Sequence, residues 1–122
     1  MSSSSLEQLV RGFADAWNRH DVEALLSMMT EDAVFDAARG PEPWGARHIG
    51  KGELRKAFSA VWDAFPDASW DDPTHVVIGD RGFSEWTFRG TSADGNRVEV
   101  RGVDIFTFDN GLISKKDTFR KA

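Results

Sequence analysis

The chain has 122 residues, a formal net charge of −5 and no cysteine, with 40% hydrophobic and 29% charged residues. Its length predicts one domain over residues 1–122, in which the Ser-rich residues 1–5 are expected to be disordered. The acidic balance argues against a nucleic-acid partner, and the missing cysteine excludes disulfides, thiolate metal sites and cysteine nucleophiles. No apolar run approaches the roughly 18 residues of a membrane span, so we expect a cytoplasmic protein with no membrane partner.

Three helices are predicted in the first half of the chain. Apolar residues recur at helical spacing over Leu6–Trp17, with Ser5 as a candidate cap, and again over Leu54–Phe65. A short helix between them is predicted to begin after the N-cap Asp21 and to keep Met29 on its inner face.

Strands are predicted to follow the helices. A short strand at Ala33–Asp36 leads into a Gly/Pro-rich loop over Ala37–His48. Asp94-Gly95 and Asn110-Gly111 are typical hairpin turns, and together with a turn at Asp80–Gly82 they separate alternating segments at 75–79, 83–91, 97–108 and 112–121. The expected fold class is α+β, with three N-terminal helices packed on a curved, mostly antiparallel sheet that encloses a pocket.

Two segments, WNRHDVEALLSMMTEDAVF and GVDIFTFDNGLISKKDTF, carry a resemblance to a known superfamily. Over about Leu6 to Lys121 the chain resembles the NTF2-like superfamily, and within it the SnoaL-like and ketosteroid isomerase-like proteins. The resemblance implies a cone-shaped, cystatin-like α+β domain with a mostly apolar pocket, commonly a homodimer through the outer sheet face. Activities in this superfamily include isomerisation, aldol-type cyclisation, dehydration and epoxide hydrolysis, while some members only bind a ligand or another protein.

Asp104 is the main candidate for chemistry. Alternation along its strand puts Asp104 on the same face as Phe106 and Phe108. The resemblance places it at the oxyanion-hole aspartate of ketosteroid isomerases, an acid kept protonated by an apolar site. Two interpretations stay open: a desolvated neutral acid, or an ionised carboxylate paired with a lysine. The same alignment puts three last-strand residues on the pocket side, namely Lys116, Thr118 and Arg120.

Two other positions of the isomerase pattern do not match. Phe13 stands where the family has its oxyanion tyrosine, and the chain contains no tyrosine. The general-base position falls on Ala37, with Asp36 one residue early, so Asp36 points inward only if a bulge re-aims it. The Arg-x-Asp pair of the epoxide hydrolases is absent, because Arg101 and Asp104 are three residues apart.

The sequence therefore favours acid/base catalysis by Asp104 with Lys116 or Asp36, of isomerase, cyclase or lyase type, on an apolar carbonyl-containing substrate. No cofactor is expected, and no histidine pair has metal-ligand spacing. Two alternatives remain: a protein that binds a small hydrophobic ligand without chemistry, and a dimeric interaction module.

Aromatic and cationic residues are the candidates for ligand contact. Trp44 lies in the Gly/Pro-rich loop, where it is either a lid or an anchor of the loop. Alternation leaves open which of Glu85 and Trp86 faces the pocket. Two cations on the inner wall suggest anionic ligand groups. The predicted ligand-binding residues are Phe13, Trp17, Trp44, His48, Trp86, Phe106, Thr118 and Arg120.

Overall fold

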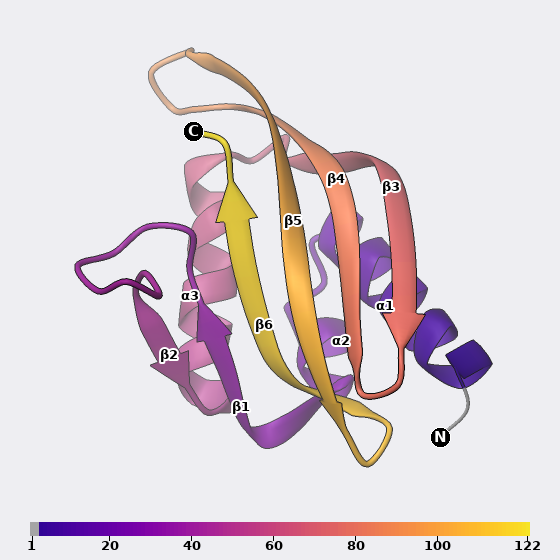
Figure 1. Ribbon diagram of the computed structural model, residues 1–122. Coiled ribbons are helices and arrows are strands. Elements are labelled where there is room, and N and C mark those ends of the chain that lie inside the picture. Colours follow the sequence, from indigo (N-terminus) through magenta and orange to yellow (C-terminus); the bar gives the residue numbers. More distant parts are fainter. Residues whose placement is uncertain (1–2) are drawn as a thin grey trace.

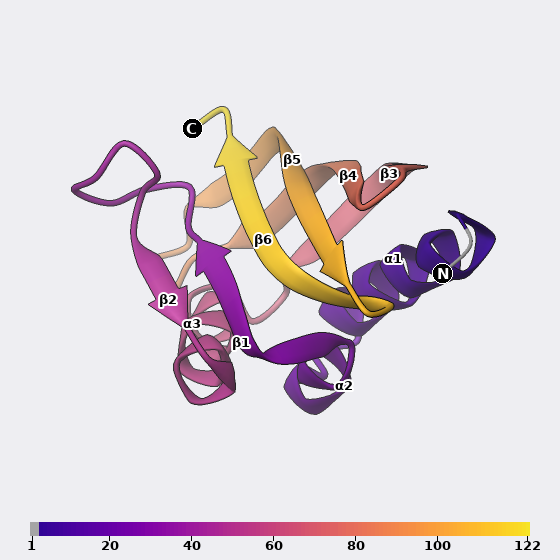
Figure 2. The same ribbon diagram turned by 60° about the horizontal axis from the view of Figure 1, so that its bottom comes forward.

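The structure is a computed structural model that describes residues 3–122. One six-stranded sheet, in the order β2-β1-β6-β5-β4-β3, curls over three helices that cover a single face (Figures 1 and 2). This arrangement confirms the predicted α+β fold. The elements are α1 (Ser3–Asn18), α2 (Val22–Ser27), β1 (Met29–Asp36), β2 (Arg47–Ile49), α3 (Lys51–Ala64), β3 (Ser69–Ile78), β4 (Arg81–Thr91), β5 (Arg97–Asp109) and β6 (Leu112–Arg120).

The helices form where the apolar spacing predicts them, with corrections at two ends. Helix α1 already begins at Ser3, so residues 3–5 are helical, while residues 1–2 of the segment expected to be disordered lie outside the described residues. The predicted N-cap Asp21 is confirmed, since its Oδ1 accepts a hydrogen bond from Ala24 N at 3.1 Å. Helix α2 ends before Met29, because the carbonyl of Met28 accepts a bond from Ile113 N and brings the chain to β6.

The sheet is mixed. Strands β3 to β6 form the predicted antiparallel meander, but β1 pairs with β6 in parallel, with Phe35 opposite Lys116. Strand β3 begins at Ser69, well before the predicted start at His75. The register of β3 shifts between Asp71 and Thr74, around an Asp-Pro step, and this irregularity hid the first half of the strand from the alternation pattern.

The core lies between the helices and the inner face of the sheet. Phe13, Leu54, Phe58 and Phe106 are almost completely buried there. Trp17 on α1 meets Phe58 on α3 edge to face, with ring centroids 4.9 Å apart. Within the described residues, no helix is long and apolar enough to cross a membrane. The cytoplasmic location stays a prediction.

Candidate functional site

A pocket of about 380 Å³ opens between α3, the inner face of the sheet and the loop that follows β1; we call it the inner pocket. Four aromatic side chains line it, namely Trp17, Phe35, Trp70 and Trp86. The small residues Ala57 and Ala60 of α3 also border the pocket. Its volume lies within the usual range for small-molecule sites, roughly 300–1,000 Å³.

The register of β4, β5 and β6 brings the polar candidates to this pocket. Asp104 on β5 lies opposite Thr118 on β6, and Trp86 on β4 lies opposite Gly102. Because side chains alternate along a strand, Asp104, Thr118 and Trp86 share the inner face. Of the two neighbours on β4, Trp86 therefore lines the inner pocket, and Glu85 borders a groove on the outer face.

Asp104 accepts polar contacts from three directions. Trp86 Nε1 donates to Asp104 Oδ2 at 3.1 Å, and Thr118 Oγ1 donates to Oδ1 at 2.6 Å. Lys116 Nζ lies 3.1 Å from the same Oδ1 and donates to Thr118 Oγ1 at 2.6 Å. The structure thus contains the ion pair between Asp104 and Lys116, and Thr118 closes it into a triangle. All three groups around the carboxyl are donors, which is the hydrogen bonding of an ionised carboxylate.

Lys116 is a buried cation surrounded by rings. Only 5% of the residue is exposed, and Nζ lies 4.5 Å from the ring centroid of Phe35 and 5.2 Å from that of Trp17. Burial lowers the pKa of Lys116 below its ordinary value, while the charge and hydrogen bonding of Asp104 act in the opposite direction. The lowered pKa makes the ammonium a better proton donor than a lysine in water.

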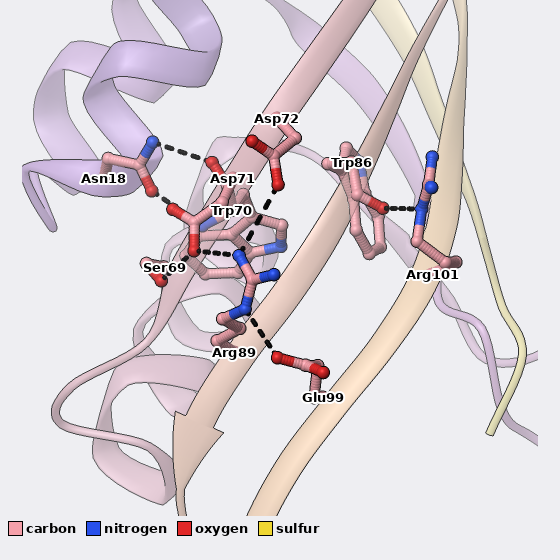
Figure 3. A network of polar contacts seen from close by, with 9 residues as sticks. All are labelled: Asn18, Ser69, Trp70, Asp71, Asp72, Trp86, Arg89, Glu99 and Arg101. Atoms are coloured by element: carbon pink, nitrogen blue, oxygen red, sulfur yellow. Dashed lines mark hydrogen bonds and ion pairs between the residues drawn. The ribbon is translucent and has the colours of Figure 1, made fainter.

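A glycine allows Trp86 to reach Asp104. A Cβ atom at Gly102 would overlap the six-membered ring of Trp86 and crowd the carbonyl oxygen of Phe119. The glycine therefore lets the indole lie flat against β5 with its Nε1 directed at the carboxylate. Arg101 Nε donates to the Trp86 carbonyl at 3.4 Å, as Figure 3 shows.

Trp70 is held at the far wall of the pocket by polar contacts (Figure 3). Asn18, the last residue of α1, makes two hydrogen bonds with the backbone of Trp70. Its Nδ2 donates to the Trp70 carbonyl oxygen at 3.0 Å, and Trp70 N donates to Asn18 Oδ1 at 2.8 Å. Arg89 on β4 joins the neighbouring Asp71 at 2.9 Å to Glu99 on β5 at 2.7 Å. The hydrogen bond to Glu99, followed by the one to Asp71, raises the pKa of Arg89 above its ordinary value. Together, these contacts hold the first residues of β3, including Trp70, in place.

Asp36 does not reach the inner pocket. The residue is completely buried, and its carboxylate accepts two hydrogen bonds from Arg47, at 2.8 and 2.9 Å, with Lys115 Nζ at 3.5 Å. These bonds from Arg47, with a smaller contribution from Lys115, hold the pKa of Asp36 below its ordinary value. The irregularity of β1 lies earlier, between Met29 and Val34, so normal alternation sends Asp36 to the outer face.

The remaining predicted residues divide into two groups. His48 and Arg120 line the inner pocket, and the His48 ring stacks on Phe35 at 5.6 Å. Phe13 and Phe106 pack edge to face in the core, at 5.6 Å, beside a separate small cavity that also touches Asp104.

Trp44 is not among the lining residues. It is 45% exposed, and the guanidinium of Arg47 lies over its ring at 4.9 Å. Arg47 forms an ion pair with Asp36 on the outer face. Trp44 packs against Arg47 and therefore lies away from the inner pocket.

Sequence reasoning missed several lining residues, among them Phe35, Trp70 and Arg39. Trp70 precedes the Asp-Pro step, where alternation read backwards from His75 loses its phase. Arg39 lies in the loop after β1, and no periodic pattern describes such a loop. Its path depends on a backbone bond from Ala37 N to Ala46 O at 2.9 Å. No group of three His, Asp or Glu side chains within residues 3–122 is placed to hold a metal ion.

Solved structures share this fold. The chain superimposes on a candidate polyketide cyclase from Xanthomonas campestris pv. campestris with a TM-score of 0.85 and 22% identity, covering 96% of this chain and 90% of that one. A candidate polyketide cyclase from Pseudomonas putida gives a TM-score of 0.83 and 20% identity, covering 93% and 90%.

An NTF2-like protein of unknown function from Mesorhizobium loti is 31% identical, with a TM-score of 0.81 and coverage of 98% and 93%. No curated protein sequence matches this chain. The family model of the SnoaL-like domain matches residues 10–116, which include Asp104 and Lys116. The chain therefore belongs to the SnoaL-like family of the NTF2-like superfamily, and its inner pocket has the size of a small-molecule site.

Proposed function

We propose that this protein binds a small apolar carbonyl compound in the inner pocket and catalyses a proton transfer on it without a cofactor. The observation that carries the proposal is the ion pair of Asp104 and Lys116 on the wall of an aromatic pocket. A buried ion pair pays a desolvation penalty that its attraction often fails to offset, so it is weak evidence for a structural role. Ionisable groups with a perturbed pKa in a cleft are candidates for acid/base catalysis.

The two side chains would divide the reaction between them. The ammonium of Lys116 donates a hydrogen bond to the carbonyl oxygen of the substrate, and the carboxylate of Asp104 takes a proton from the neighbouring carbon. The electron pair of the broken C–H bond forms the C=C bond of an enolate, whose oxygen Lys116 stabilises. Return of the proton from Asp104 to a different carbon completes an isomerisation. In a cyclisation, the enolate carbon instead forms a C–C bond to a second carbonyl carbon of the same substrate, the π pair of that carbonyl moves to its oxygen, and the proton held by Asp104 passes to the resulting alkoxide, which restores the carboxylate. The names of the two candidate polyketide cyclases support this reaction class.

A second candidate function is binding without chemistry. The triangle of Asp104, Lys116 and Thr118 supplies donors to Asp104 Oδ1, and Trp86 Nε1 donates to Oδ2, so both carboxylate oxygens have partners within the protein before a ligand binds. In this case the ion pair would only orient a polar group of the ligand.

Deuterium exchange distinguishes the two functions. The carbon acids of an enolisable two-ring ketone, such as 2-tetralone, exchange in D₂O and are followed by NMR, while binding is measured by calorimetry. We expect wild-type protein to accelerate exchange well above buffer, and Asp104→Asn to bind the ketone but lose the acceleration. Asp36→Asn is the matched control, because it makes the same change on the opposite face. Binding without acceleration would favour the second function, and no binding would contradict both.

We also propose that two copies associate through the outer face of β3, β4 and β5. An apolar groove of about 370 Å³ runs over this face and includes Val76, Phe83 and Ile105. Ile78, which also lines this groove, is 74% exposed. An exposed apolar surface of this kind indicates an interface. Light scattering is expected to show a dimer that Ile78→Glu converts to a monomer; a wild-type monomer would contradict the proposal.

A further inference from the structure

The walls of the inner pocket carry more positive than negative charge. Arg39, Lys116 and Arg120 line it together with a single carboxylate, that of Asp104, although the whole chain has a net charge of −5. Lys116 and Asp104 neutralise each other at 3.1 Å. Across residues 3–122, no carboxylate forms an ion pair with Arg39 or Arg120. Two cations of the pocket therefore lack a counter-charge from the protein.

Arg120 is partly desolvated. It is the last residue of β6 and lies opposite Gly102, with its guanidinium carbon 5.3 Å from the ring centroid of Phe88. Its Nε is buried and has no hydrogen-bond partner among the described atoms. Burial, with a smaller contribution from Arg39, lowers the pKa of Arg120 below its ordinary value. A cation in such a place is costly unless an anion joins it.

Arg39 lies at the same pocket on a loop whose base is fixed. The Arg39 carbonyl accepts a bond from Ala46 N at 3.1 Å. Gly45 has a φ of 85°, and a Cβ there would collide with the carbonyl oxygen of Ala37, so the loop can close only with glycine at this position. The backbone of Arg39 is therefore held beside the pocket, while its side chain is exposed and can follow a ligand.

We propose that the ligand of the inner pocket carries a carboxylate, which binds between Arg120 and Arg39. The planar guanidinium groups of arginine match a carboxylate with paired hydrogen bonds. The apolar body of the ligand would lie against Trp17 and Trp70, and its carbonyl would meet Lys116. This inference rests on the proposed function in its first part, that the inner pocket binds a small carbonyl compound.

The strand sets the size of this ligand. Lys116 and Arg120 are four residues apart on β6, which corresponds to about 13 Å between their Cα atoms at ~3.3 Å per residue. Both side chains line the inner pocket, so a ligand that contacts both must span a gap of this order. The ligand class is therefore an aromatic or alicyclic carboxylic acid of two to three rings, with a carbonyl at the end opposite the carboxylate.

A pair of matched compounds tests the carboxylate position. Calorimetry compares 2-naphthoate with 2-naphthamide, which has the same shape and no charge, at pH 7. We expect naphthoate to bind at least tenfold more tightly, and the difference to fall as salt is raised. Arg120→Gln should remove most of the preference, Arg39→Gln part of it, and Arg120→Lys should retain part of it. Arg11→Gln, at an exposed position of α1 that does not line the inner pocket, is the control that should change nothing, and circular dichroism shows that each variant is folded.

The outcomes separate this inference from the proposed function. Equal binding of the two compounds, or a preference that survives both Arg120→Gln and Arg39→Gln, would overturn the carboxylate site. Failure of naphthoate to bind while 2-tetralone binds and exchanges would overturn the inference and leave the proposed function standing. Preferential binding of naphthoate with no accelerated exchange of 2-tetralone would support the inference and remove the catalytic step.

Discussion

Asp36 and Asp104 lie on opposite faces of the same sheet, although both are buried. Asp36 on β1 is in register with Asp117 on β6, while Asp104 on β5 is in register with Thr118, the next residue. Neighbouring residues of a strand point to opposite faces. Only Asp104 therefore borders the inner pocket, and Asp36 belongs to an ion-pair cluster with Arg47 on the outer face.

Removing Lys116 is expected to destabilise the protein strongly. Lys116→Met leaves Asp104 buried without its cation, and loss of one partner of a buried pair costs about 3–5 kcal/mol. Urea denaturation measures the free energy of unfolding of Lys116→Met, Asp104→Asn and the double variant. We expect the double variant to recover part of the loss. Strictly additive effects would mean that the two side chains do not stabilise each other.

Stability should also depend on the ionisation of Lys116 at alkaline pH. Its folded-state pKa lies below the ordinary value near 10.4, so between these two pKa values the unfolded chain binds more protons than the folded one. The Lys116 contribution to the free energy of unfolding must then increase as pH rises through that window. Urea unfolding of wild type and Lys116→Met, from pH 7 to 10.5, should show a difference that grows with pH. A difference that shrinks would mean that the Asp104 pairing outweighs burial.

Asp36 is expected to contribute to stability at neutral pH and to lose this contribution in acid. Its folded-state pKa is lowered, so the stabilisation is present above the ordinary value near 3.9 and disappears as pH falls through the lowered value. Asp36→Asn should cost about 1–3 kcal/mol at pH 7, as expected for hydrogen bonds to a buried charge. The gap to wild type, followed by thermal unfolding, should narrow below pH 4. A constant gap would show that shape rather than charge matters at this position.

Gly102→Ala is expected to disturb the site without touching a polar group. The added methyl collides with the Trp86 ring, so the indole must move and its bond to Asp104 is strained or lost. Overpacking of this kind costs about 1–3 kcal/mol. Tryptophan fluorescence and 2-tetralone exchange report the change, and Gly52→Ala, where a Cβ meets nothing within 4 Å, is the matched control. Unchanged exchange in folded Gly102→Ala would mean that Trp86 does not position Asp104.

Local patterns in the sequence determined the α+β class, the periodicity of α1 and α3, the hairpin turns and the face on which Asp104 lies. Each of these depends on residues close together in the chain, such as the alternation of Asp104 with Phe106. The location of Asp36 on the outer face also follows from alternation, because β1 has no bulge between Val34 and Asp36.

Only the tertiary structure decided what surrounds Asp104. The parallel pairing of β1 with β6 brings Phe35 beside Lys116, and the register of β4 with β5 sets Trp86 against Gly102. The tertiary structure also brings Arg39 to the pocket, because backbone hydrogen bonds close the loop that follows β1. These contacts join segments that are distant in sequence, and their register is set by the packing of the whole sheet on its helices. No local pattern encodes such a register, which is why the partners of the buried carboxylate appeared only in the fold.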